Sequence, residues 1–259
     1  MTRIALVTGA SSGLGREFVK RIDAGEAGQF DEVWAVARRA DRLDALVRTC
    51  ATKVRPFCLD LTDVMSFDMI EGALAETEGA DVGLLVNNAG FGVFGDFALS
   101  TRDEPTDMLN ILVKAPVELM YRALPHMHAG ARIINVASVA AFLPQPRLAV
   151  YAAAKRFILD ITRALDAELG DVNIHATALC PKFMKTEFLD APGDAEVARK
   201  MSEAIGFERA DEVVTAALRA SRAGRSLCIP SLDMKAYYLA SRVMPYPVAL
   251  KLEKMLGAL

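Results

Sequence analysis

A tyrosine and a lysine placed one helical turn apart are the first residues whose types and spacing suggest chemistry. Tyr151-Ala-Ala-Ala-Lys155 sets two polar side chains in an otherwise apolar run. If the run is helical, both side chains project from one face. A lysine ammonium beside a phenol favours the phenolate, so we expect it to lower the pKa of Tyr151. The pair would then be a proton donor and acceptor near neutral pH. A solvated tyrosine and lysine on an ordinary helix give the same spacing.

A glycine-rich turn near the beginning of the chain could bind a phosphate. The apolar run at 4–7 leads into Thr8-Gly-Ala-Ser-Ser-Gly-Leu-Gly15, and a helical pattern follows. Glycines let the backbone approach a pyrophosphate, and free N–H groups at a helix start point towards the anion. We therefore predict a dinucleotide-binding turn, although a plain tight turn would also use glycine. Its candidate binding residues are Gly9, Ser11, Ser12, Gly13, Leu14 and Gly15.

Two arginines follow the second predicted strand, at 32–37. An NAD-binding site usually has an acidic residue here for the ribose 2′-hydroxyl, but this chain has Arg38 and Arg39. A guanidinium pairs well with a phosphate. The arginine pair therefore favours NADP(H) over NAD(H), unless both side chains are simply solvated.

Further polar residues follow other predicted strands. Asp60 follows the strand at 54–59, where adenine contacts are expected, although helix capping alone would explain it. Asn87-Asn-Ala-Gly90 follows the strand at 82–86, and buried amides there can tie neighbouring strands together. Ser138 ends the strand at 131–137.

The elements that must position these residues alternate between strand and helix. Further strands are predicted at 172–179 and 226–229. Helices are predicted at 41–48, 103–128, 151–170 and 210–222, and another begins after Thr62 or Asp63 and runs to about 78. This alternation predicts an α/β fold, a Rossmann-type doubly wound parallel sheet of about seven strands with helices on both faces. Ligands bind past the carboxyl ends of such strands, where every candidate residue falls. Residues 187–207 have a mixed pattern and are predicted to be mobile.

Composition excludes several classes of protein. The chain has 259 residues, 53% of them hydrophobic, and a net charge of −3 without long runs of one sign. We expect no nucleic-acid partner, no signal peptide, no integral membrane segment and no metal site. The four cysteines are scattered, as in reduced cytoplasmic proteins.

Together these motifs resemble the classical short-chain dehydrogenase/reductase (SDR) family. The matching pieces, in family order, are the glycine-rich turn, Asn87-Asn-Ala-Gly90, Asn110, Ser138 and Tyr151-x-x-x-Lys155. The resemblance covers residues 3 to about 230. Each piece is weakly specific, whereas the combination is highly specific.

The resemblance implies a role for each matching position. Tyr151 would be the general acid for carbonyl reduction and the base for alcohol oxidation. Lys155 would lower the tyrosine pKa and hold the nicotinamide ribose, Ser138 would bind the substrate oxygen, and Asn110 would support a water-linked proton path. The remaining cofactor contacts would come from Asp60, Leu61, Asn88, Ala89, Gly90, Pro181 and Thr186.

One departure from the family pattern concerns the loop beside the nicotinamide. The family usually has Pro-Gly after the sixth strand, and this chain has Pro181-Lys182. Lysine adopts a positive φ only at a cost, so we expect an altered loop. Lys182 would be a solvated loop residue or a charge near the substrate entrance.

The predicted substrate pocket is mostly apolar. A hydrophobic ketone or secondary alcohol, of the hydroxysteroid or acyl-chain type, would suit it, although several of its residues would serve equally in the core. The expected lining is Phe91, Val93, Phe94, Ala140, Phe142, Phe183, Met184, Phe188 and Leu189.

We predict one NAD(P)-binding domain over 1–259, with a substrate loop at about 182–208. The extension at about 231–259 would be a lid or a subunit contact. The predicted activity is that of an NADP(H)-dependent ketone reductase or alcohol dehydrogenase (EC 1.1.1.-). The family resemblance implies that the protein forms a homodimer or homotetramer. The alternative is a nucleotide-sensing or scaffold protein that kept the fold and lost catalysis.

Overall fold

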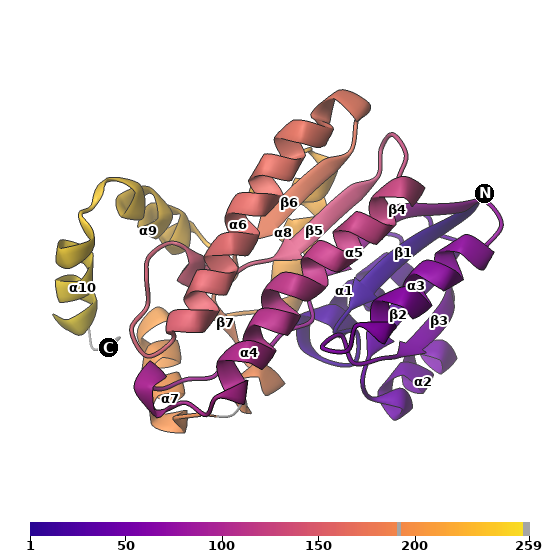
Figure 1. The fold of residues 1–259 in the computed structure, drawn as a ribbon. Coiled ribbons are helices and arrows are strands. Elements are labelled where there is room, and N and C mark those ends of the chain that lie inside the picture. The colour runs from indigo at the N-terminus through magenta and orange to yellow at the C-terminus, as the bar shows by residue number, and fades with distance from the viewer. Residues whose placement is uncertain (191–192, 256–259) are drawn as a thin grey trace.

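A parallel sheet forms the centre of the molecule (Figure 1). The structure is a computed structural model that describes residues 1–190 and 193–255, without the side chains of 189–190 and 252–255. Within these residues seven parallel strands pair in the order β3-β2-β1-β4-β5-β6-β9, which confirms the predicted doubly wound sheet. The strands are β1 (Thr2–Thr8), β2 (Glu32–Ala37), β3 (Lys53–Cys58), β4 (Ala80–Asn87), β5 (Arg132–Val136), β6 (His175–Leu179) and β9 (Leu227–Cys228).

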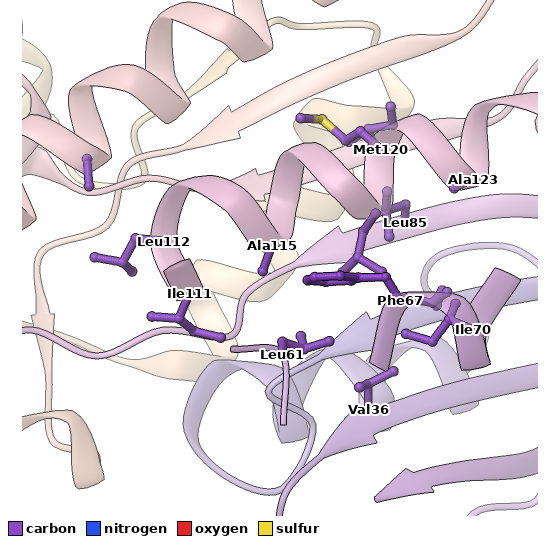
Figure 2. Packing of buried hydrophobic residues seen from close by; sticks show 14 of the residues in the cluster. Val36, Leu61, Phe67, Ile70, Leu85, Ile111, Leu112, Ala115, Met120 and Ala123 are labelled. Atoms are coloured by element: carbon purple, nitrogen blue, oxygen red, sulfur yellow. The ribbon is translucent and has the colours of Figure 1, made fainter. Parts of the chain in front are cut away.

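Helices cover both faces of the sheet because alternate strand residues point to opposite sides. In β1, Ile4 packs into one core cluster and Ala5 into the other. The first cluster holds α3 (Met65–Glu76), α5 (Ala115–Ala123) and α6 (Ala149–Leu169). The second holds α1 (Gly13–Asp23), α2 (Ala40–Thr49) and α8 (Ala210–Arg222). Figure 2 shows Phe67 and Ile70 of α3 packed beside Leu85 of β4 in the first cluster.

The helix predicted at 103–128 is divided into four parts. α4 (Asp103–Leu109) passes into a π-helical turn, Asn110–Lys114, and then into α5; a 3₁₀ turn, Leu124–His126, closes the run. Pro116 lies in the first turn of α5 and Pro125 in the 3₁₀ turn. Both prolines lie where the hydrogen-bond pattern of the run changes, as expected of a residue that has no N–H to donate.

The region with a mixed sequence pattern contains regular structure in its described residues. α7 (Ala195–Ile205) begins at Asp194, whose carboxylate accepts hydrogen bonds from the N–H groups of Glu196 and Val197. β7 (Phe183–Met184) and β8 (Phe207–Glu208) pair on either side of it. A local N-cap and this small sheet therefore define the loop.

The C-terminal extension forms two helices, α9 (Leu232–Val243) and α10 (Tyr246–Met255). In Figure 1 these two yellow helices lie at the left, on the side of the sheet opposite β3. Tyr238 of α9 packs its ring against Phe142, with ring centroids 4.9 Å apart. The last predicted positions of the extension, 256–259, lie outside the described residues.

Candidate active site

The glycine-rich turn joins β1 to α1 in a close-packed arrangement that only glycine permits. Gly9 and Gly13 adopt φ of +67° and +51°, a region that disfavours other residues. A Cβ on Gly15 would lie 2.2 Å from the carbonyl oxygen of Gly9. Gly15 therefore lets α1 approach the turn, whereas Gly9 and Gly13 shape a backbone that faces the cavity.

Thr8 and Asn88 hold this turn against the end of β4. Thr8 Oγ1 accepts hydrogen bonds from the backbone N–H groups of Asn88 (2.9 Å) and Ala89 (3.0 Å). Asn88 Nδ2 donates to the carbonyl of Thr8 at 2.9 Å. The positioning role of Thr8 was not predicted, because its partners are 80 residues away in sequence.

Buried amides link three elements beneath the site. Asn87 Nδ2 donates to Asn135 Oδ1 at 2.8 Å, and Asn135 Nδ2 donates to Thr162 Oγ1 at 2.9 Å. The expected tie between neighbouring strands is thus present, extended to α6. Asn135 was missed, although a polar residue inside the apolar strand 131–137 was the available signal.

Ser138, Tyr151 and Lys155 come together at the carboxyl end of β5. Tyr151 and Lys155 lie one turn apart on α6 and are 8% and 6% exposed, which excludes the solvated-helix alternative. Lys155 Nζ donates to the carbonyl of Val136 at 2.6 Å and lies 5.6 Å from the centre of the Tyr151 ring. Ser138 Oγ accepts from the N–H of Ala140 at 3.1 Å and is hydrogen-bonded to Tyr151.

The prediction that Lys155 lowers the pKa of Tyr151 was wrong for this structure. Burial raises the pKa of Tyr151 above that of a free phenol, and the hydrogen bond with Ser138 opposes this only in part. Burial also lowers the pKa of Lys155 to about 8. Desolvation disfavours the charged form of each group, so Tyr151 is a protonated phenol at neutral pH.

Asn110 lies at the junction of α4 and the π-helical turn. The N–H of Ala115 bonds to the carbonyl of Asn110, five residues back, as expected in a π-helix. The side chain of Asn110 does not line the cavity described below, whereas its neighbour Ile111 does. A turn of this kind often marks a functional site, but no sequence pattern predicts it.

The two arginines after β2 differ in their surroundings. Arg39 donates from Nε and Nη2 to Ser11 Oγ (3.2 and 2.9 Å) and from Nη1 to Glu187 at 2.8 Å. Arg38 is 74% exposed, with its nearest carboxylate, Asp60, 4.0 Å away. The alternative that both are merely solvated does not describe Arg39, which is fixed on the glycine-rich turn.

Lys182 does not strain the loop after β6. Positive φ among the described non-glycine residues is confined to Arg147 and Asn173, so the loop does not need glycine at 182. The Lys182 side chain is 10% exposed, and its Nζ lies 2.5 Å from an oxygen of Asp233. The residue is therefore not solvated, and it ties the loop to α9 at the wall of the cavity described below.

The loop that follows β6 then crosses the site. Thr186 lies over the glycine-rich turn, where a Cβ on Gly13 would be 3.5 Å from it. Phe188 packs against Tyr151, with ring centroids 5.6 Å apart. The loop therefore contacts both the turn and the tyrosine.

One cavity of about 760 Å³ joins these groups. It contains every predicted site residue except Asn110 and Gly15, and five of the expected apolar residues: Phe91, Ala140, Phe183, Met184 and Phe188. The prediction was wrong for Val93 and Phe94, which line a separate hollow. It was also wrong for Phe142, which belongs to the core under α9. The side chain of Leu189 lies outside the described residues. Apolar lining that was not predicted comes from Met201, Ile205, Met234 and Tyr237.

Comparison with known proteins decides the family. The family model for short chain dehydrogenases matches residues 3–196. The chain belongs to the short-chain dehydrogenase family. Carbonyl reductase (NADPH) 2 of Sus scrofa is 29% identical over 245 residues, covering 92% of this chain and 96% of that protein.

Two solved structures share the fold. A short-chain dehydrogenase from Sphingobium yanoikuyae, in complex with NADPH, has a TM-score of 0.78 at 26% identity and covers 98% of this chain and 96% of its own. A short chain dehydrogenase/reductase from Burkholderia phymatum, in complex with NAD, has a TM-score of 0.81 at 24% identity, with 92% coverage of both chains.

The family membership confirms the predicted enzyme class. This short-chain dehydrogenase is an oxidoreductase that acts on CH–OH groups with NAD(P). In the part of the chain that the structure describes, no helix is long and apolar enough to cross a membrane.

Proposed function

We propose that this short-chain dehydrogenase is an NADP(H)-dependent enzyme that interconverts a hydrophobic ketone and a secondary alcohol. The observation that carries the proposal is the single cavity, which holds the glycine-rich turn at one end and Ser138, Tyr151 and Lys155 at the other. A dinucleotide bound along it would bring its reactive ring to the tyrosine.

The residues along the cavity suit a dinucleotide. Gly13 faces open space apart from Thr186, so a pyrophosphate can approach the backbone there. When bound, NADP(H) supplies or accepts a hydride. The proposed contacts are Gly9, Ser11, Ser12, Gly13 and Leu14 for the pyrophosphate, Asp60 and Leu61 for the adenine, and Asn88, Ala89, Gly90, Tyr151, Lys155, Pro181 and Thr186 for the remainder. Gly15 would act only by packing.

The proposed preference for NADP(H) depends on Arg38 and Arg39. Both line the cavity beside Ser11 and Ser12. Arg39 is held by Ser11 with its planar guanidinium at the turn, which suits bidentate phosphate recognition. The complexes of the two structural neighbours differ in cofactor, so the preference needs direct measurement. Dissociation constants for NADPH and NADH, obtained by titration calorimetry, would test it; tighter binding of NADH would overturn it.

Tyr151 would give its proton to the carbonyl oxygen during reduction. Its raised pKa keeps the phenol protonated, which is the form that reduction requires. Ser138 would hold the same oxygen, because its hydroxyl already contacts the phenol. Lys155, mostly charged at pH 7, would hold the nicotinamide ribose beside the phenol. Asn110 would support proton relay from behind the cavity.

The substrate class follows from the walls of the cavity. Aromatic and methionine side chains surround the tyrosine, among them Phe91, Phe183, Met184 and Phe188. Such surfaces adapt to bulky apolar molecules. A hydroxysteroid or an acyl-chain ketone would bury its apolar body here and place its polar oxygen at Ser138 and Tyr151.

Tyr151→Phe tests the activity. We expect kcat to fall by about 10²- to 10⁴-fold, the usual contribution of a general acid. NADPH affinity should be nearly unchanged, and unfolding free energy should fall by about 1 kcal/mol through loss of the hydrogen bond with Ser138. Tyr121→Phe is the control, since Tyr121 is 78% exposed. A Tyr151→Phe enzyme that turns over ketones at the original rate would refute the assignment. No turnover by the unmodified protein across a broad ketone panel would favour the scaffold alternative.

We also propose a single domain, a cytoplasmic location and a homo-oligomer. All four cysteines, which lie among the described residues, are free thiols, as in reducing compartments. Leu109, Tyr121 and Phe157 are exposed on α4, α5 and α6, and these helices could meet a second copy. The loop at 182–208 would close over substrate, and the extension from 231 would act as a lid. Size-exclusion chromatography with light scattering would test the oligomer.

A further inference from the structure

A carboxylate from the substrate loop already occupies the arginines beside the glycine-rich turn. Glu187 Oε2 accepts from Arg39 at 2.8 Å, and Glu187 Oε1 accepts from Arg42 at 2.5 Å. These residues are 148 and 145 positions apart in sequence. Glu187 therefore bridges the substrate loop to the beginning of α2.

The neighbours of Glu187 couple this bridge to the rest of the site. Thr186 lies over Gly13, and Phe188 packs against Tyr151. Phe188 N–H also bonds to Thr186 Oγ1 at 3.4 Å, so the three residues form one compact segment. A ligand that moves Glu187 must therefore also disturb the ring that covers the tyrosine.

We propose that Glu187 is a specificity-determining residue that competes with the cofactor 2′-phosphate for Arg39 and Arg42. Binding of a 2′-phosphorylated dinucleotide displaces the carboxylate and loosens the segment 186–188 from the cavity. A dinucleotide with a free 2′-hydroxyl leaves the bridge in place. The inference rests on the proposed function, since it concerns the same cofactor site.

The hydrogen-bond donors of Arg39 explain why the Glu187 carboxylate and a 2′-phosphate exclude each other. Nε and Nη2 are already directed to Ser11, and Nη1 to Glu187. A phosphate close to ionised Glu187 would meet like-charge repulsion. Hydrogen bonds from Arg42 and Arg39 lower the pKa of Glu187 to about 2, so the carboxylate remains ionised in the neutral range. Asp60, another acid that lines the cavity, lies 4.0 Å from Arg38 instead.

Glu187→Gln tests the competition with two simple probes, 2′,5′-ADP and 5′-AMP. The variant keeps the shape of the side chain and removes its charge. We expect 2′,5′-ADP to bind about three- to tenfold tighter, because exposed ion pairs of this kind have modest strength, and 5′-AMP to bind within twofold. Glu196→Gln is the control: Glu196 pairs with Lys200 at 2.7 Å on α7 and does not line the cavity.

Hydrogen exchange gives a readout that does not depend on affinity. In the unmodified protein, 2′,5′-ADP should speed exchange at residues 186–188, whereas 5′-AMP should not. In Glu187→Gln this exchange should be fast before any ligand is added. Slower exchange on addition of 2′,5′-ADP to the unmodified protein would contradict displacement.

The outcomes separate this inference from the proposed cofactor preference. If the unmodified protein prefers 2′,5′-ADP and Glu187→Gln binds it no tighter, the competition is refuted and the NADP(H) preference stands. If the unmodified protein binds both probes equally and Glu187→Gln binds only 2′,5′-ADP more tightly, the NADP(H) preference is refuted. The role of Glu187 is then supported.

Discussion

Lys155 should make the stability of this protein depend on pH in a predictable direction. Burial lowers its pKa from 10.5 to about 8. Below pH 8 the native and unfolded states both hold the proton, and the native state bears the full cost of a buried charge. Between pH 8 and 10.5 the native state releases the proton while the unfolded chain retains it. The cost is then relieved, so stability rises with pH in this window.

The size of this effect follows from the same two pKa values. Their difference corresponds to about 3 kcal/mol, at about 1.4 kcal/mol for each pKa unit. Between pH 7 and 9.5, linkage gives a change of about 2 kcal/mol. In Lys155→Met the charge is absent, so the carbonyl of Val136 loses its donor at every pH. The unmodified protein should therefore gain about 2 kcal/mol relative to Lys155→Met over this range.

Urea unfolding at pH 7, 8, 9 and 9.5 would measure the difference between the two proteins. Comparing them removes the titration of other groups, which both share. Lys251→Met is the control, because Lys251 is exposed on α10 and its removal should shift stability equally at each pH. A difference that stays flat, or that falls as pH rises, would refute the reasoning. Catalytic rates measured alongside should be strongly reduced in Lys155→Met and unchanged in Lys251→Met.

Two further predictions concern packing around the cavity. Gly15→Ala should lower unfolding free energy by about 1–3 kcal/mol in chemical denaturation, because its Cβ would lie 2.2 Å from the Gly9 carbonyl oxygen. Gly72→Ala, with nothing within 4 Å, should instead stabilise α3 by about 0.5–1 kcal/mol, and equal effects of both changes would contradict this. Asp233→Asn should weaken the contact with Lys182 that anchors α9 and raise KM for a bulky ketone by about two- to fivefold; unchanged KM and unchanged hydrogen exchange in α9 would show that the contact does not hold the lid.

Sequence patterns predicted the sheet and most of the cavity because those features are local. Buried parallel strands appear as apolar runs, and each predicted site residue directly follows one of them or lies in the next helix. The glycine-rich turn and the Tyr151–Lys155 spacing likewise depend on neighbouring residues. The structure therefore brings these groups together with the expected order of elements.

Tertiary structure decided whatever depends on distant residues or on burial. Phe94 and Phe142 have the same apolar character as Phe188, and only packing sends them to the core while Phe188 covers Tyr151. Burial also reversed the expected direction of the Tyr151 pKa, because desolvation exceeds the effect of the hydrogen bond with Ser138, and the ammonium of Lys155 is directed to Val136.

The sequence alone predicted that Arg39 lies near the glycine-rich turn, because both follow strands whose carboxyl ends meet at one edge of a parallel sheet. It could not determine that Glu187, 148 residues later, would cross the site and accept a hydrogen bond from this arginine. Nor could it place Lys182 against Asp233. Such ion pairs carry no periodic signal, because folding brings their partners together from separate elements.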